Sequence, residues 1–411
     1  MDRVKKAGVA LAVVCLVVLT VLNLASDAQA KKPDVIRIAF VSDMSGPYAP
    51  MTRQYAIGFQ DGLAYFNQEL GGVEGVPLEL LVRDTGGKMD ATVSHYMNLR
   101  EMTPKPLFLG LVVSSDAEAL RERAKEDQIP IFCPAATSAI YPLAYNFAYF
   151  PLYPDQAGAF MDWLGETWDQ KRPAKLAFLT WDSTYGRAVL TDEVRAYAKK
   201  KNIEIVAEEL FGLRDVDVTT QLTRIRAKGA DWIYSNTTAH GPWTIAKGIK
   251  EMGYPVNLVT SCGSQAHNTL VAAPPGLMDG SYVVNFFRSF ADTDNPMMKK
   301  VREYFDKNNR TAKDWGMGYF GAFWFIDVFH QAITRAVKKV GWDKLDGQAV
   351  KEAVETFRDY QPLDATMYTY TATKHSPEKI YMGRVKGPYV LPLGGGYQWR
   401  TCPDLRPDQF K

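Results

Sequence analysis

The stretch Ile129–Tyr141, IPIFCPAATSAIY, decides the fold that this sequence predicts. Its β-branched and aromatic residues lie between two prolines, which is typical of a short strand buried in a parallel sheet. After Pro134 the chain changes to small and hydroxyl residues. Ligands bind outside the carboxyl ends of the strands in open α/β sheets, so this loop is either an ordinary surface turn or part of a binding site. The second alternative places Ala135, Ala136 and Thr137 beside a ligand.

Strand and helix patterns alternate on both sides of this stretch. Upstream, apolar runs at Val35–Val41, Leu78–Val82 and Leu107–Val113 predict strands, and an apolar stripe in Ala56–Leu70 predicts a helix between the first two. Downstream of Tyr149–Pro154 a second series begins, with predicted strands at Ala174–Thr180, Ile203–Glu208, Trp232–Ser235 and Leu258–Thr260. Two such series predict two domains, each a parallel sheet covered by helices, with a ligand cleft between them.

Two serines follow the third predicted strand. Ser115 to Glu118 have the form of a capping box, in which the Ser115 hydroxyl would accept from a backbone N–H of the first helical turn. Alternatively, Ser114, Ser115 and the helix N-terminus form a set of donors for an anion such as a carboxylate. Both interpretations stay open, because Ser114 can donate while Ser115 caps the helix.

Composition and charge narrow the class of protein. The chain has 411 residues, of which 46% are apolar and 23% charged, and its net charge is +2. A chain of this kind folds into sizeable cores, and it carries no basic field for nucleic acid. The histidines are scattered, and Cys133, Cys262 and Cys402 lack metal-ligand spacing, so we expect no metal, no cofactor and at most one disulfide. The nucleophile motif G-x-S-x-G is absent from the sequence, and we do not expect an enzyme.

The N-terminal residues form a separate segment. Basic residues precede an apolar run from Ala7 to Ala25, and Ala28-Gln29-Ala30 ends it as a small-x-small cleavage site. This pattern predicts a signal peptide at residues 1–30 and an exported, periplasmic mature chain that begins at Lys31. The run is also long enough to remain as a membrane anchor, since a spanning helix needs about 17–25 residues.

Seven stretches of the chain resemble the Leu/Ile/Val-binding type of periplasmic solute-binding protein, which supplies ABC transporters. The match covers nearly all of the mature chain, and the stretches occur in the order of the family. They are SGPYA at Ser45–Ala49, NQELGGVEGVPLEL at Asn67–Leu80, GLVVSS at Gly110–Ser115, IPIFCPAATS at Ile129–Ser138, DSTYGRA at Asp182–Ala188, DVTTQLTRIRAKGAD at Asp217–Asp231, and YFGAFWFIDVFHQAI in the late apolar helix.

The resemblance implies the type I periplasmic binding-protein fold, an α/β fold of two Rossmann-like lobes with parallel-type sheets and a hinge of three crossovers. We place the crossovers near Tyr149–Pro154, Ser281–Arg288 and Asp359–Thr369. Each lobe is then discontinuous in sequence: residues 31–151 and 288–362 form the first, and residues 152–287 and 363–411 form the second.

The resemblance also implies a binding site. Ser114 or Ser115, together with Ala135, Ala136 and Thr137, matches the positions that hold a ligand carboxylate in this family, and Tyr185 matches the position that closes from the second lobe. Amino-acid binders of the family carry an acidic residue near Thr260–Ser264, where this chain has Cys262. A buried ammonium without a counter-charge costs several kcal/mol, which argues against an α-amino acid. Further expected neighbours of the ligand are Tyr48, Tyr153, Trp181, His240 and Trp243.

These features favour an extracytoplasmic solute-binding protein that captures a small aromatic or aliphatic carboxylate and delivers it to the membrane permease of an ABC importer. We expect a monomer that closes its lobes on the ligand. Two alternatives remain: a branched-chain amino-acid binding protein of the same transport class, and a ligand-sensing domain for a membrane partner.

Overall fold

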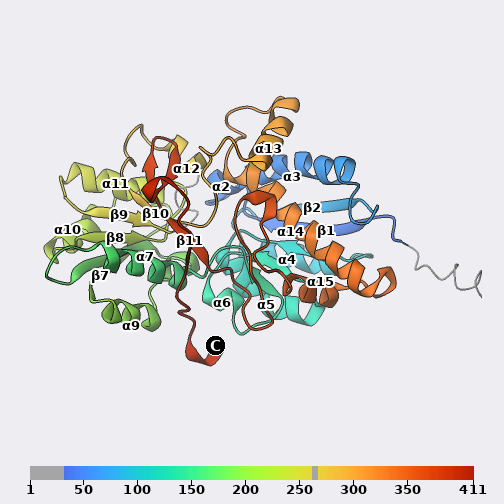
Figure 1. Cartoon of the computed structure of the whole chain (residues 1–411), viewed down its shortest axis with the longest axis horizontal. Coiled ribbons are helices and arrows are strands. Elements are labelled where there is room, and N and C mark those ends of the chain that lie inside the picture. The colour runs from blue at the N-terminus through green and yellow to red at the C-terminus, as the bar shows by residue number, and fades with distance from the viewer. Residues whose placement is uncertain (1–31, 262–266) are drawn as a thin grey trace, which may run out of the picture.

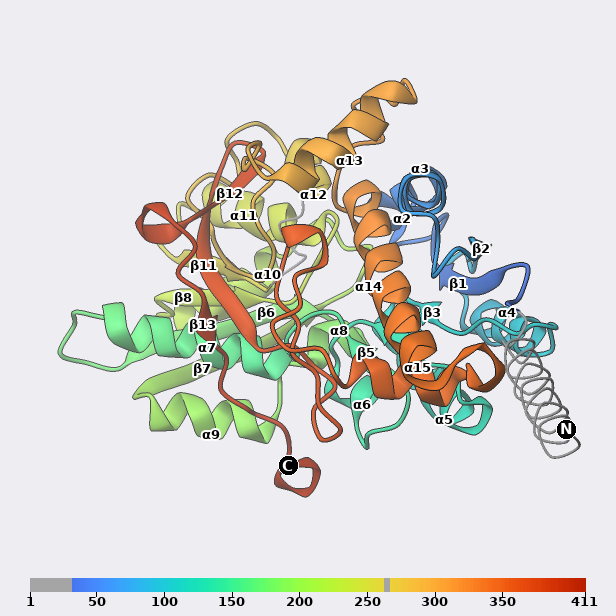
Figure 2. The same cartoon turned by 45° about the vertical axis from the view of Figure 1, so that its right-hand side comes forward.

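The computed structural model describes residues 32–261 and 267–411 and has two lobes side by side, each a sheet with flanking helices (Figure 1). The predicted signal peptide and Cys262 lie outside the described residues. Helices from distant parts of the chain combine in the first lobe, since α14 (Met317–Val340) packs beside α3 (Gln54–Ala64) (Figure 2). The predicted α/β class with two lobes is therefore confirmed.

The first lobe contains a five-stranded parallel sheet in the order β2-β1-β3-β4-β5. Its strands are β1 (Ile36–Ser42), β2 (Leu78–Asp84), β3 (Leu109–Gly110), β4 (Ile131–Cys133) and β5 (Asn146–Ala148). Besides α3 and α14, its helices are α2 (Ala49–Thr52), α4 (Met89–Arg100), α5 (Ser114–Asp127), α6 (Thr137–Ile140), α13 (Pro296–Lys307) and α15 (Gly347–Val354). The stretch Ile129–Tyr141 thus forms the buried strand β4, as predicted, and its predicted loop contains the short helix α6.

The second lobe is built on the sheet order β12-β11-β10-β9-β8-β6-β7, with β13 paired to β11. Its strands are β6 (Ala174–Trp181), β7 (Ile203–Phe211), β8 (Trp232–Ser235), β9 (Asn257–Thr260), β10 (Tyr282–Asn285), β11 (Lys379–Lys386), β12 (Tyr389–Pro392) and β13 (Arg400–Thr401). The helices are α7 (Tyr153–Thr167), α8 (Thr184–Arg187), α9 (Asp192–Lys200), α10 (Thr219–Ala227), α11 (Gly241–Glu251) and α12 (His267–Ala272). Strands β6 to β10 are parallel, and the C-terminal strands add an antiparallel edge.

Phe325 of α14 lies at the centre of the first lobe's core. Its ring is fully buried and lies 5.9 Å from the ring of Phe40 on β1 and 4.9 Å from that of Phe132 on β4. The ring packs close to β3 because position 110 is a glycine, where a Cβ atom would come within 2.9 Å of it. The apolar pattern of this late helix predicted a core position, and its burial confirms that prediction.

The chain passes between the lobes at residues 149–152, after β5, and at residues 286–295, after β10. The third passage comes later than the sequence predicted. The hydroxyls of Tyr368 and Tyr370 donate to the carbonyls of Tyr149 and Ala148 at 3.0 and 2.7 Å. The His375 ring also stacks on a β5 phenylalanine, 4.0 Å away. Residues 365–375 therefore pack on the first lobe, and the chain crosses at 376–378, just before β11.

Asp155, in the first turn of α7, gives a prediction about pH. Its carboxylate is fully buried and accepts from the Leu405 amide at 2.8 Å. Burial, with a smaller contribution from Asp404, raises its pKa to about 7, while the Leu405 hydrogen bond, Lys374 and Arg406 oppose the rise. The folded protein then binds more protons than the unfolded chain between about pH 4 and pH 7, so stability falls as pH rises through this window.

We expect Asp155→Asn to remove this part of the pH dependence. The amide keeps an acceptor for Leu405 but does not ionise. The wild-type free energy of unfolding should lose about 2–4 kcal/mol more than that of the variant between about pH 4 and pH 7.5, since one pKa unit corresponds to about 1.4 kcal/mol. Denaturant titrations at a series of pH values measure this difference, and parallel profiles for the two proteins would refute it.

Candidate ligand-binding site

A cavity lies between the lobes and holds about 640 Å³ of empty space, including the part open to solvent. Six aromatic side chains line it: Tyr48, Tyr55, Tyr149, Phe150, Tyr153 and Tyr185. The other apolar residues of the wall are Met51, Val112, Pro134 and Met317, and its polar residues are Thr52, Ser114 and Thr238. Pockets for small organic ligands have this character, with many apolar groups and a few polar ones.

The wall is assembled mainly from segments that follow strands. Ser114 follows β3, Pro134 follows β4, Tyr149 follows β5 and Thr238 follows β8. Parallel strands bring their carboxyl ends to the same edge of a sheet, and ligands of α/β proteins bind there. The carboxyl ends of the parallel strands in both sheets thus face the cavity.

The first turn of α5 borders the cavity at Ser114. The helix begins at Ser114 itself, because Val113 before it is extended, and no side chain caps the helix. The predicted capping role of Ser115 is therefore wrong: this residue is already inside the helix, one position beyond Ser114. The first N–H groups of α5 keep their partial positive charge, which favours an anionic ligand group.

Tyr185 of α8 supplies an aromatic face from the second lobe. Its hydroxyl hydrogen-bonds the Ser261 hydroxyl at 2.9 Å and lies 3.3 Å from the Thr237 carbonyl oxygen. Its ring packs edge-on against Tyr153, with 4.8 Å between the ring centroids. The hydroxyl is thus held by its own lobe, and what this residue offers the cavity is apolar surface.

Tyr48 connects the lobes across the cavity. Burial raises the pKa of its hydroxyl to about 12, and this hydroxyl hydrogen-bonds Ser183 of the second lobe. Its ring also packs edge-on against Trp181, at 6.1 Å. A second contact between the lobes joins the Thr269 hydroxyl to the Met51 sulfur at 3.3 Å. The two lobes are therefore in direct contact beside the cavity.

The described wall of the cavity carries no formal charge, since all of its residues named above are neutral at pH 7. Residues 262–266, which lie outside the described parts of the chain, read CGSQA in the sequence. Burial raises the pKa of Asp116, in the first turn of α5, to about 6, but this carboxyl hydrogen-bonds Thr92 of α4. Among residues 32–261 and 267–411, no group of His, Cys, Asp and Glu side chains is arranged to hold a metal ion.

Four residues that the sequence singled out line the cavity: Tyr48, Ser114, Tyr153 and Tyr185. Others lie elsewhere. Ala135, Ala136 and Trp181 are buried in the core, Ser115 is half-buried, and His240 lines a separate groove with the loop 45–47. Thr137 begins α6, and its buried hydroxyl has no hydrogen-bond partner in the described parts of the chain. Cys262 lies outside the described residues.

The sequence did not single out several residues of the wall. Tyr55 and Met317 belong to helices whose apolar residues indicate only a buried face. Tyr149 and Phe150 lie in the first passage between the lobes, where the sequence predicted a crossover but no contact of these two residues with a ligand. Thr238 lies in the loop after β8, in which the sequence predicted His240 as a ligand neighbour instead.

A family model described as periplasmic binding protein matches residues 35–388 of the chain. No curated protein sequence matches it. In the described part of the chain, no helix has both the length and the apolar character that a membrane crossing requires.

Solved structures share the fold at low sequence identity. A branched-chain amino acid ABC transporter protein from Thermus thermophilus with bound valine has a TM-score of 0.79 and 18% identity over 89% of this chain and 97% of its own. A fatty acid ABC transporter substrate-binding protein from Thermomonospora curvata has a TM-score of 0.74 and 19% identity over 92% and 96%. A solute-binding protein of an ABC transporter from Rhodopseudomonas palustris, in complex with 3,4-dihydroxybenzoic acid, has a TM-score of 0.72 and 17% identity over 90% and 99%.

Proposed function

Because the chain belongs to the periplasmic binding protein family, we propose that it is the solute-binding protein of an ABC importer and captures a small aromatic or aliphatic carboxylic acid. The family and the fold predicted from the seven sequence stretches are confirmed, and with them a binding protein outside the cytoplasm instead of an enzyme. The ligand class, the permease partner and the monomeric state are parts of the proposal.

The observation that carries the ligand class is the uncharged, aromatic wall around the start of α5. A carboxylate beside Ser114 would accept hydrogen bonds from its hydroxyl and from the uncapped N–H groups of the first turn. Hydrogen bonds to a charged group contribute roughly 1.5–3 kcal/mol each. The six aromatic rings would pack against the apolar part of the ligand. Tyr185 is one of them, and its hydroxyl already hydrogen-bonds Ser261 within the second lobe.

The same wall disfavours an α-amino acid. An ammonium group in this cavity would find no carboxylate among the wall residues that the structure describes. Residues 262–266, at the position where the resemblance leads one to expect an acidic residue, contain none in the sequence. The solved relatives named above are a protein with bound valine, a fatty acid ABC transporter substrate-binding protein and a protein in complex with 3,4-dihydroxybenzoic acid, so the fold accommodates several acids. The side chains that line the cavity would then determine which of these acids the protein binds.

A panel of ligands in thermal-shift and calorimetric measurements tests the proposal. We expect benzoate or hexanoate to stabilise the protein by about 2.7 kcal/mol when present at a hundred times the dissociation constant. Benzamide and hexanamide, which lack the charge, are the matched controls and should bind much more weakly. Leucine and valine should give little or no shift. A saturable shift with leucine alone, or equal affinity for an acid and its amide, would refute the proposed ligand class.

A further inference from the structure

The C-terminal residues 403–411, here called the strap, leave the second lobe and end against the first. After β13, the Leu405 amide donates to Asp155 of α7 at 2.8 Å. Pro403 and Leu405 also pack on Gly158 of the same helix, where a Cβ atom would come within 2.5 Å of the proline. The first half of the strap is therefore seated on the second lobe.

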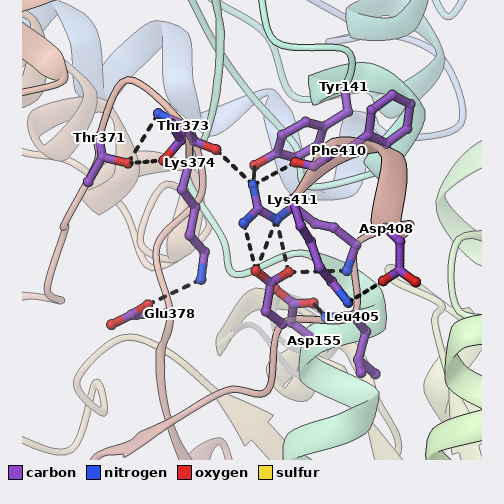
Figure 3. Close-up of polar contacts among 12 residues, drawn as sticks. Tyr141, Asp155, Thr371, Thr373, Lys374, Glu378, Leu405, Asp408, Phe410 and Lys411 are labelled. Atoms are coloured by element: carbon purple, nitrogen blue, oxygen red, sulfur yellow. Dashed lines mark hydrogen bonds and ion pairs between the residues drawn. The ribbon is translucent and has the colours of Figure 1, made fainter.

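The second half of the strap contacts Tyr141, at the end of α6 in the first lobe. The Phe410 ring stacks on the Tyr141 ring, with 5.6 Å between the centroids and 23° between the planes (Figure 3). Tyr141 itself is fixed to the first lobe, because its amide donates to the Thr137 carbonyl and its own carbonyl accepts from Arg121 of α5. The strap thus reaches across from one lobe to the other.

Arg406 holds these contacts together. Its guanidinium lies 5.2 Å from the centre of the Tyr141 ring and donates to the Tyr141 hydroxyl at 3.0 Å. It also pairs with Asp404 at 2.6 Å and donates to the Thr373 carbonyl at 2.7 Å. The residue is only 6% exposed. A guanidinium is rarely buried unless it is paired in this way, so loss of its partners would be costly.

Thr373 belongs to the turn that leads into the third passage between the lobes. The turn is closed by backbone hydrogen bonds between Thr371 and Lys374, and His375 after it packs on the first lobe. Lys374 then pairs with Glu378 at 3.1 Å, across the residues that cross to the second lobe. Arg406 is therefore bonded to the chain immediately before a crossover.

From these contacts we propose that the strap is a non-covalent fourth link between the lobes, and that it favours their closed arrangement. A rotation of the lobes about the three covalent passages would displace Tyr141 relative to α7, and the buried Arg406 would lose partners. A ligand held by both lobes binds the closed form, and its apparent affinity is proportional to the fraction of closed protein. The strap would thereby raise affinity, an effect that rests on the proposed function.

Two strap variants and one control test this link. Arg406→Gln removes the central contacts, and Phe410→Ala removes only the stack at the half-buried end, so it keeps the test valid if the first variant folds poorly. The control is Arg172→Gln, which also breaks an arginine–carboxylate pair, with Asp231 at 2.6 Å, and a cation–π contact, with Trp168 at 5.3 Å. Both contacts of Arg172 lie within the second lobe.

Small-angle scattering of the ligand-free proteins is the first measurement. We expect a larger radius of gyration for both strap variants than for the wild type and the control. Equal radii of gyration in all four proteins would refute the proposal that the strap favours the closed arrangement, whichever ligand the protein binds. Calorimetry with benzoate is the second measurement, and we expect affinity to fall about tenfold in Arg406→Gln and not in Arg172→Gln.

The two measurements separate the strap from the proposed function. Larger radii with unchanged benzoate affinity would overturn the effect of the strap on binding. Larger radii of gyration in the strap variants, with no benzoate binding even by the wild type, would count against the proposed ligand class. The proposed link between the lobes would still hold. If the strap variants had a lower melting temperature but the same radius of gyration and affinity as the wild type, the strap would stabilise the fold without affecting the closure of the lobes.

Discussion

Ser114→Asp should weaken carboxylate binding by more than about a hundredfold and leave the protein folded. The substitution removes a hydroxyl donor, and a hydrogen bond to a charged group contributes roughly 1.5–3 kcal/mol. It also places a negative charge against the ligand carboxylate, in a cavity with no cation among the wall residues that the structure describes. The new carboxylate would itself accept from the first N–H groups of α5, where an acid stabilises a helix by about 0.3–1 kcal/mol.

Ser115→Asp is the matched control for this experiment. It adds the same charge to the same helical turn, one residue further on, at a position outside the cavity wall. Its effect on benzoate affinity, measured by calorimetry, should be several-fold at most, because a partly solvated charge is screened. Equal losses for the two variants would show that α5 acts on the ligand only through long-range charge. Undiminished affinity in Ser114→Asp would remove Ser114 from the site.

The second large effect is expected from Phe325→Ala, which should destabilise the protein by about 3–5 kcal/mol. Besides its contacts with β1 and β4, the Phe325 ring lies 5.6 Å from Tyr55 and 5.2 Å from Tyr149. Both tyrosines line the cavity. The variant should therefore lose ligand affinity as well as stability, because the rings behind the cavity wall lose their support.

Phe325→Leu separates the two effects. Leucine fills most of the space, so the loss of stability should be smaller than for alanine. Denaturant unfolding measures stability, and calorimetry on the folded fraction measures affinity. If Phe325→Ala lost stability but bound benzoate like the wild type, the core would not position the two tyrosines.

The sequence correctly predicted the helices and strands that depend mainly on the pattern of neighbouring residues. The apolar run before Pro134 became β4, and the long apolar helix became α14 in the core. Ser114 was found because it follows a strand and opens a helix, and the structure places it in the cavity wall. In each case the pattern of neighbouring residues is enough to determine the local structure.

Features that depend on contacts between distant segments were not predicted. The start of α5 is set by the extended backbone of Val113, and the capping box in the sequence placed the N-cap two residues too late, at Ser115. The third passage was placed too early because Tyr368 and Tyr370 are anchored by carbonyls more than two hundred residues away in the sequence, at 219 and 222 residues. Met317 reaches the cavity from a helix end that carries no sign of a site.

The packing of α14 in the first lobe has a consequence for how the chain folds. This helix lies against α3 and the first sheet, yet it is synthesised only after the strands of the parallel second sheet. A chain that emerges N-terminus first therefore holds β1 to β5 with an uncovered apolar face until residue 340 is available. Contacts between such distant segments slow folding, and exposed strands of incomplete domains aggregate. The first lobe therefore completes its core only after the parallel strands β6 to β10 of the second lobe have been synthesised.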